Sequence, residues 1–153
     1  RISVYHSVAT LFRQLITYQS SVTYFPAVRV LAFGGERLLS SDLALMRQRF
    51  PADALVYASI GSTETGTFAR LFLRSDSDTG HTVIPLGITP PDCKVCLVGS
   101  DGKPVANGET GEIVVESRFI ANGYRCQPDE TAQVFSTSQQ ESSLRRYHTG
   151  DFG

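Results

Sequence analysis

Residues 28–58, VRVLAFGGERLLSSDLALMRQRFPADALVYA, carry the pattern that decides the fold. The run 28–33 is apolar except for Arg29, as expected of a strand that is buried on both faces of a parallel sheet. Helical spacing of apolar residues follows over 42–50, and a second apolar run at 54–58 predicts another strand. The order strand, helix, strand favours a parallel α/β layer.

The helix predicted over 42–50 has signals at both ends. Ser40 or Ser41 is expected to cap its N-terminus, since a serine hydroxyl can accept a hydrogen bond from a free backbone N–H. Asp42 lies in the first turn, where the helix dipole stabilises negative charge, and Pro51 ends the helix. The apolar face of this helix consists of Leu43, Met46 and Phe50.

The pattern of the chain changes near residue 81. Before it, a β-branched run at 2–5 and helical spacing over 8–18 predict a further strand and helix. After it, Gly and Pro separate short predicted strands, and 133–146 reads as a solvated loop. These strands are predicted at 94–98, 112–116 and 119–120, with a turn at 100–103. We therefore predict an α/β sheet portion over 1–80 and a β-rich, distorted barrel-like subdomain over 81–153.

The composition is that of a globular protein with balanced charge. The 153 residues include 14 Lys or Arg and 15 Asp or Glu, which gives no basis for a charge-driven nucleic-acid or membrane partner. No apolar run could span a bilayer, and the three cysteines favour a reducing, cytoplasmic setting. Cys93 and Cys96 form a C-x-x-C without a second pair at zinc-site spacing, so we expect no metal there. Because the chain starts at Arg1 and stops at Gly153 after a polar motif, we expect it to be a piece of a longer protein.

Two adjacent glycines, Gly34 and Gly35, follow the strand predicted at 28–33. In an open parallel sheet, ligands bind beyond the carboxyl ends of the strands. Glycines remove side chains where a flat ligand could lie against the backbone. A tight turn between strand and helix explains the same pair equally well.

Residues 58–66, ASIGSTETG, place four hydroxyl side chains around one carboxylate. Hydroxyls and free backbone N–H groups suit phosphate oxygens, and a neighbouring carboxylate suits Mg²⁺. Taken alone, the stretch also fits an ordinary polar loop.

Residues 147–151, YHTGD, end in a Gly-Asp pair. A carboxylate can accept two hydrogen bonds from the vicinal hydroxyls of a ribose. Alone, such a pair is more often a simple turn.

In combination and order, these motifs are far more specific. The succession GGERL, GSTETG, GETGEIVVESRFIANGYRCQPDETAQVF and YHTGDFG resembles the adenylate-forming enzyme superfamily. It is most similar to adenylation domains of nonribosomal peptide synthetases and hybrid megasynthases, over nearly the whole chain.

This resemblance implies an activity. Family members join a carboxylic acid to ATP, release pyrophosphate and hold the acyl-adenylate until a thiol takes the acyl group. The implied cofactors are ATP and Mg²⁺. The implied acceptor is phosphopantetheine on a carrier-protein domain, and the acid is an amino or other carboxylic acid.

The resemblance also implies roles for single residues. Thr63 would donate its hydroxyl to the α-phosphate, Glu64 would help to bind Mg²⁺, and Asp151 would accept hydrogen bonds from both ribose hydroxyls. The other nucleotide-binding residues would be Gly34, Gly35 and Glu36 beside the adenine, with Ser59, Ile60, Gly61 and Ser62. The acyl pocket would be lined by His6, Leu31, Phe33, Ser59, Thr67 and Phe68.

Ile60 is the one departure from the family pattern. The family usually places an aromatic residue there, typically Tyr, which packs on the adenine ring. Stacking of a base on an aromatic side chain contributes about 1–3 kcal/mol, so Ile60 should keep apolar contact with adenine but lose part of that stabilisation.

Several family elements are absent from this sequence. The phosphate-binding loop, the acidic residue that recognises an amine, the hinge and the C-terminal lid with its lysine would belong to the rest of the adenylation domain. We therefore expect this chain to be inactive alone. Two alternatives are a fragment of an acyl-CoA synthetase and a non-catalytic nucleotide-binding or scaffold segment, against which intact Thr63, Glu64 and Asp151 argue.

Overall fold

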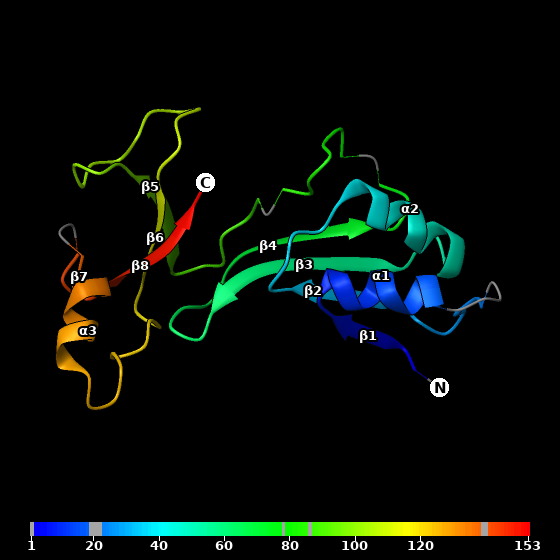
Figure 1. Cartoon of the computed structure of the whole chain (residues 1–153), viewed down its shortest axis with the longest axis horizontal. Helices are drawn as coiled ribbons and strands as arrows, with labels where there is room; N and C mark the ends of the chain where they lie inside the picture. The colour runs from blue at the N-terminus through cyan, green and yellow to red at the C-terminus, as the bar shows by residue number, and fades with distance from the viewer. Residues whose placement is uncertain (1, 19–22, 78, 86, 139–140) are drawn as a thin grey trace. The chain divides into compact units, whose positions relative to one another are not determined.

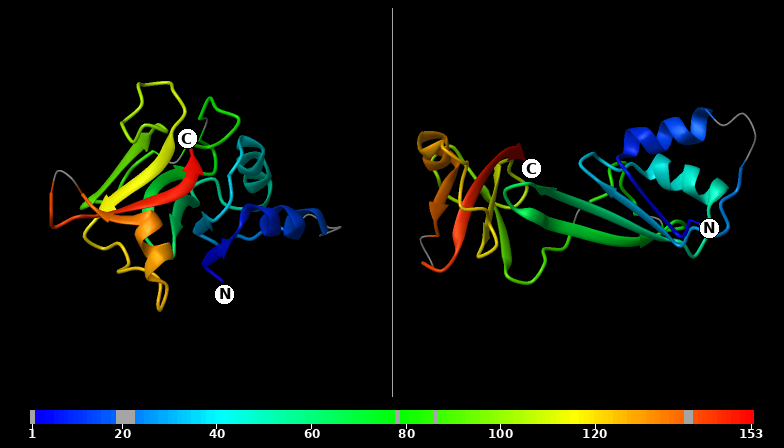
Figure 2. Two further views of the ribbon diagram at one scale, coloured as in Figure 1. Left: turned by 60° about the vertical axis from the view of Figure 1, so that its left-hand side comes forward. Right: turned by 90° about the horizontal axis from the view of Figure 1, so that it is seen from below.

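The computed structural model describes residues 2–18, 23–77, 79–85, 87–138 and 141–153. The chain divides into two compact units (Figures 1 and 2). The first unit contains Arg1–Ile60 and Ala69–Ile88, and the second contains Gly61–Phe68 and Thr89–Gly153. Within the described ranges, no helix is long and apolar enough to cross a membrane. The predicted boundary after residue 80 took no account of the segment Gly61–Phe68, which clusters with the later part of the chain.

The first unit is built on the predicted strand–helix–strand order. Its sheet has the strand order β1-β2-β3-β4, and the first three strands run parallel. The strands are β1 (Val4–Ser7), β2 (Val30–Gly34), β3 (Leu55–Ser62) and β4 (Gly66–Arg74). The prediction of a parallel α/β layer is thus confirmed. Strand β4 was not predicted from the sequence.

Two helices, α1 (Ala9–Tyr18) and α2 (Ser40–Arg49), cover one side of this sheet (Figure 2). Phe12 of α1 packs edge-on against Phe33 of β2, with ring centroids 5.4 Å apart. Phe50, directly after α2, stacks on Phe25 at 5.2 Å. The same core includes Leu31, Leu43, Met46 and Val56. The apolar face predicted for the second helix is therefore confirmed as the face that packs in the core.

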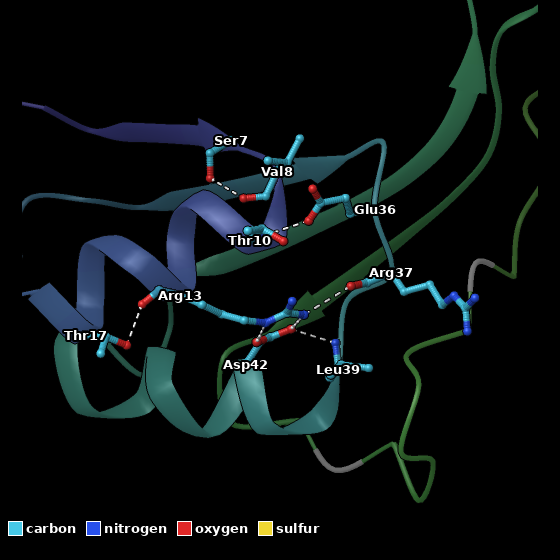
Figure 3. Close-up of polar contacts among 9 residues, drawn as sticks. All are labelled: Ser7, Val8, Thr10, Arg13, Thr17, Glu36, Arg37, Leu39 and Asp42. Carbon is cyan, nitrogen blue, oxygen red and sulfur yellow. Dashed lines mark hydrogen bonds and ion pairs between the residues drawn. The ribbon is translucent and has the colours of Figure 1, made fainter.

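The start of α2 differs from the prediction (Figure 3). The helix begins at Ser40, with Leu39 as its N-cap residue, and the Ser40 hydroxyl donates to the carbonyl of His81. Instead of a serine, the Asp42 carboxylate accepts the backbone N–H of Leu39 at 2.8 Å. Asp42 also receives two hydrogen bonds from the Arg13 guanidinium of α1, at 2.7 and 2.8 Å. The predicted serine cap is wrong because a first-turn carboxylate takes that role and ties the two helices together.

The second unit contains a four-stranded antiparallel sheet in the order β5-β6-β8-β7. Its elements are β5 (Cys93–Val98), β6 (Glu112–Ser117), α3 (Pro128–Val134), β7 (Phe135–Thr137) and β8 (Arg145–Phe152). The strands predicted at 94–98 and 112–116 are confirmed, as is the turn at 100–103, where the Gly102 N–H donates to the Gly99 carbonyl at 3.0 Å.

Two predictions for the second unit are wrong. Residues 119–120 lie in the turn after β6 rather than in a strand, and only Ile120 of this apolar pair is buried. The segment 133–146 is not one loop, because it holds the end of α3, β7 and the start of β8. Residues 139 and 140 of that segment lie outside the described residues. Polar side chains on the edge strand β7 and on its neighbour β8 explain why the sequence pattern indicates a solvated loop in place of these strands.

Candidate functional site

The stretch Gly61–Gly66 forms the tip of the β3–β4 hairpin. Strand β3 ends at Ser62, a turn covers 63–65, and β4 starts at Gly66. A Cβ atom on Gly61 would lie 2.2 Å from the Gly66 carbonyl oxygen across the hairpin. Only glycine permits this close approach, so the predicted polar loop is a tightly closed β-turn.

Hydrogen bonds within the turn distinguish its three hydroxyl groups. The Ser62 and Thr65 side-chain oxygens lie 3.1 Å apart, and the Thr65 hydroxyl donates to the Gly66 carbonyl at 2.8 Å. The Thr63 side chain is exposed, and its hydroxyl makes no hydrogen bond with the residues that the structure describes. Thr63 is therefore the hydroxyl of this turn that is available to a ligand, whereas Ser62 and Thr65 shape the turn.

Glu64 is held from both its backbone and its side chain. Its carbonyl accepts the Ala121 N–H at 2.8 Å, and its carboxylate oxygen Oε1 accepts the Tyr124 hydroxyl at 2.7 Å. This hydrogen bond is the main cause that lowers the pKa of Glu64, against the opposing effect of burial. The carboxylate is thus ionised at neutral pH and fixed beside Thr63 in the turn.

The donor set around Glu64 fits Mg²⁺ that is shared with phosphates. Mg²⁺ keeps several waters and commonly takes one or two carboxylates together with substrate phosphate oxygens. Among the described residues, no group of three or more His, Cys, Asp or Glu side chains could hold a metal ion. One ionised carboxylate beside a free hydroxyl suits an ion that arrives with a nucleotide better than an all-protein metal cage.

An aromatic cluster supports Glu64 in the second unit. The rings of Tyr124 and Phe135 lie 5.4 Å apart edge-on, and those of Phe135 and Tyr147 lie 4.9 Å apart. Tyr147 is only 7% exposed, and burial, with further contributions from Tyr124 and Glu64, raises the pKa of its hydroxyl. Tyr147 therefore remains a neutral phenol in this cluster, next to the Tyr124 hydroxyl that donates to the carboxylate.

Asp151 lies on β8, next to a segment of the strand where the pairing with β6 is irregular and which Glu112 holds. The Glu112 carboxylate accepts the Gly150 N–H at 3.0 Å and lies 2.9 Å from His148 Nδ1. The Thr149 hydroxyl donates to the Ile113 carbonyl and accepts the Asp151 N–H. The Asp151 side chain is exposed, so its carboxylate is presented from an ordered backbone.

Gly34 is the last residue of β2 in the first unit, and Gly35 and Glu36 follow it. Gly35 has φ +78°, and Gly34 is paired with Ser59 of β3, whose hydroxyl lies 3.4 Å from the Phe33 carbonyl. The Glu36 carboxylate accepts the Thr10 N–H at 2.8 Å in the first turn of α1 (Figure 3). Hydrogen bonding by the Thr10 side chain, and then by this N–H, lowers the pKa of Glu36. Glu36 thus caps a helix, while the adenine role of this segment stays a prediction.

The residues predicted to line an acyl pocket have different surroundings. His6 on β1 is exposed, as is Thr67 on β4. Leu31 and Phe33 are buried in the core beneath α1 and α2, whereas Phe68 is buried in the second unit. Residues two positions apart on a strand point to the same face, so Leu31 and Phe33 both pack in the core, and the pocket stays a prediction.

The remaining predicted site residues are divided between the units in the same way. Half-buried Ile60 belongs to the first unit, and Gly61 is the next residue on β3 but belongs to the second. Sequence reasoning assigned no role to Tyr124, Tyr147 or Glu112, whose contacts join segments far apart in the chain. Tyr124 stands in the long motif of residues 108–135 and Tyr147 in the motif YHTGDFG. This position within a motif was the only sequence feature that could have marked them as site residues.

The chain matches known families and structures over most of its length. The family of AMP-binding enzymes matches residues 1–125. A D-alanine–D-alanyl carrier protein ligase from Streptococcus pyogenes serotype M5 (strain Manfredo) is 31% identical over 128 residues, which cover 84% of this chain and 24% of the ligase. The chain thus spans about a quarter of the length of the curated relatives that it resembles.

Solved structures agree with this match. A crystal structure of the nonribosomal peptide synthetase FmoA3 superimposes with a TM-score of 0.84 and 28% identity, over 100% of this chain and 16% of that chain. The Vibrio cholerae adenylation domain AlmE, in complex with glycyl-adenosine-5'-phosphate, has a TM-score of 0.81 and 21% identity over 99% and 29% of the two chains. The AlmE likeness concerns the fold alone. These matches bear out both the α/β and the β-rich parts of the predicted fold, and the chain belongs to the AMP-binding enzyme family of adenylate-forming ligases, as a portion of an adenylation domain.

Proposed function

We propose that this chain supplies part of the ATP site of an adenylation domain, which activates an amino or other carboxylic acid and passes it to a carrier-protein thiol. The relatives support this choice of reaction, because one is a ligase named for a D-alanyl carrier protein. A second FmoA3 structure, with 29% identity and a TM-score of 0.83, is an AMPPNP-bound form.

The arrangement of the hairpin tip carries the proposal. In this turn Thr63 has a free, exposed hydroxyl, while Ser62 and Thr65 are used within the turn. The neighbouring Glu64 is an ionised carboxylate fixed by Tyr124. A hydrogen-bond donor beside a fixed negative charge suits a phosphoryl oxygen and its metal counter-ion.

The chemistry needs no nucleophile from the protein. The substrate carboxylate attacks the α-phosphorus of ATP, a new carboxylate oxygen–phosphorus bond forms, and the bond to the leaving pyrophosphate breaks. Thr63 would donate a hydrogen bond to an α-phosphoryl oxygen as charge develops there. Bound Mg²⁺, held in part by Glu64, would neutralise charge on the phosphoryl oxygens.

The other residues would position the nucleotide. The exposed Asp151 carboxylate would accept hydrogen bonds from the two ribose hydroxyls. After activation, phosphopantetheine on a carrier protein would accept the acyl group. Gly34 and Gly35 would leave room for the adenine ring, against which Ile60 would provide apolar contact without aromatic stacking. Replacing the charged side chain of Glu64 or Asp151 with Gln or Ala would then weaken ATP binding without unfolding the protein.

The test compares Thr63→Ala with Thr137→Ala in the full-length protein, with ATP–pyrophosphate exchange measured over a panel of amino and other carboxylic acids. Loss of one donor to a developing charge should lower kcat/KM for exchange about 100-fold. Thr137 is an exposed threonine on β7 of the same unit, so Thr137→Ala should exchange like the parent protein.

Other outcomes would separate the alternatives. Equal exchange by both variants would remove Thr63 from the reaction. Acyl transfer to coenzyme A, but not to a carrier protein, would identify an acyl-CoA synthetase instead. A folded full-length protein that does not bind ATP would favour the non-catalytic scaffold.

A further inference from the structure

We propose that Tyr124 and Tyr147 are positioning residues that orient the Glu64 carboxylate for metal binding. This inference rests on the metal role assigned to Glu64 in the proposed function. It adds a specific task for two side chains that lie outside the hairpin and come from later parts of the chain.

The turn that presents Tyr124 is built closely around the first turn of α3. Gly123 has φ +135°, and a Cβ atom there would lie 2.3 Å from Thr131 Cγ2. The Tyr124 N–H donates to Thr131 Oγ1 at 2.9 Å, and the Thr131 hydroxyl donates to the Gln127 carbonyl at 2.7 Å. Only glycine at position 123 allows this approach, so the backbone of Tyr124 is fixed by α3.

The Tyr124 ring is fixed as well. It packs edge-on against Phe135, the first residue of β7, and Phe135 packs on Tyr147 of β8. The Arg145 guanidinium lies 5.7 Å from the centre of the Phe135 ring. The two phenols thus approach Glu64 from different elements but share one aromatic support.

The hydroxyl groups act on a side chain that would otherwise be free to rotate. Glu64 is half-buried at the hairpin tip, and a glutamate loses appreciable rotamer entropy when it is immobilised. The 2.7 Å hydrogen bond from Tyr124 fixes Oε1 before any ligand arrives, and Tyr147 contributes a further interaction with the same carboxylate. Groups that orient a metal ligand in this way typically affect metal affinity about 10- to 100-fold.

The experiment measures Mn²⁺ binding to the full-length protein in the presence of a non-hydrolysable ATP analogue, by electron paramagnetic resonance. Tyr124→Phe keeps the ring packing on Phe135 and removes only the hydroxyl, and we expect it to weaken Mn²⁺ binding about 10-fold. Tyr147→Phe should weaken binding by a smaller factor. Tyr18→Phe, at an exposed position on α1, is the matched control and should bind like the parent protein.

A double-mutant cycle with Glu64→Gln tests whether the tyrosines act through Glu64. We expect Tyr124→Phe to have no further effect in the Glu64→Gln background, since the coupling partner is gone. If Tyr124→Phe weakens Mn²⁺ binding just as much in the Glu64→Gln background, the positioning role is overturned. It is also overturned if both tyrosine variants bind Mn²⁺ like the parent protein while Glu64→Gln binds weakly. Either outcome leaves the proposed function intact. If Glu64→Gln itself binds Mn²⁺ normally, the metal role in the proposed function fails. Thermal unfolding of each variant identifies any that is misfolded, and Tyr147→Phe then replaces Tyr124→Phe in the cycle.

Discussion

The two units hold their candidate site segments by different means. In the first unit, Gly34 and Gly35 stand at the end of a strand whose Phe33 packs in an aromatic core with Phe12. In the second unit, Glu64 lies at a hairpin tip and is held by the hydroxyl of Tyr124, 60 positions further along the chain. One segment depends on packing, and the other depends on individual hydrogen bonds.

This difference predicts different ways to fail. Apolar burial is non-directional and scales with the area removed from water, so damage to the first unit should appear as lost stability. A hydrogen bond depends on distance and direction, so damage to the polar contacts of the second unit should alter ligand geometry while the fold persists. The three substitutions below test this contrast in order of decreasing expected effect.

The largest effect is expected for Phe12→Ala in the first unit. Phe12 is fully buried and contacts the rings of Tyr5, Phe33 and Phe50. Its removal should lower the free energy of unfolding by about 4 kcal/mol, because it leaves a cavity in a packed core. Denaturant unfolding of the full-length protein, followed by circular dichroism, measures this loss.

The matched control for Phe12→Ala is Phe119→Ala in the second unit. Phe119 is 71% exposed, and we expect its removal to change the free energy of unfolding by less than about 0.5 kcal/mol. A loss at Phe119 as large as that at Phe12 would break the comparison, because the second unit would then depend equally on apolar packing.

The contrast also explains which parts of the fold the sequence could predict. The parallel layer was predictable because its strands are buried on both faces, so 28–33 and 54–58 are continuous apolar runs. Strands β7 and β8 were missed because their side chains alternate between a buried face and a polar one. Phe135 and Tyr147 are buried, but Ser136, Arg146 and His148 beside them are polar, so polarity alone indicated a loop.

The candidate site was predictable only where its residues lie within one short motif. Thr63, Glu64 and Asp151 could be proposed because each stands in a characteristic stretch of sequence, and their roles stay predictions. Tyr124 could not be linked to Glu64, since no local pattern records a contact across 60 positions. The Thr65 hydroxyl bonds within the turn and the Thr63 hydroxyl is exposed because the hairpin closes tightly at Gly61. No local sequence pattern records this closure.

An intermediate effect is expected for Asp42→Ala, which breaks the polar contact that joins α1 to α2. Asp42 is 1% exposed, accepts two hydrogen bonds from Arg13, and accepts the Leu39 N–H at the start of α2. Removal leaves Arg13 with only the Arg37 carbonyl as acceptor and the N-terminus of α2 without its carboxylate, and should lower the free energy of unfolding by about 2 kcal/mol.

The control for Asp42→Ala is Asp101→Ala, which removes an exposed partner of Lys103. Exposed ion pairs contribute little, so this change should be within about 0.5 kcal/mol of the parent protein. If the two aspartate variants unfold alike, the buried polar contact is not a stabilising part of the first unit, and its stability rests on apolar packing alone.

The smallest effect is expected from Glu112, which holds the irregular segment of β8 before Asp151. Burial raises the pKa of Glu112, but hydrogen bonds from His148 and the Gly150 N–H, with the nearby charges of His148 and Arg146, outweigh it and leave the pKa below its ordinary value of 4.5. A carboxyl whose pKa is lower in the folded state stabilises the protein above its unfolded pKa, and this contribution is lost as the pH falls through the folded pKa. Glu112→Gln should therefore lower the free energy of unfolding by about 1 kcal/mol or less at pH 7. The difference from the parent protein should shrink as the pH falls below 4.5, which urea unfolding at a series of pH values can measure.

Glu130→Gln, at an exposed position on α3, provides the comparison. If the free energy of unfolding of Glu112→Gln instead differs from that of the parent protein by the same amount at every pH, the carboxylate charge does not hold this segment of β8. The second unit then depends less on individual polar contacts than the comparison requires.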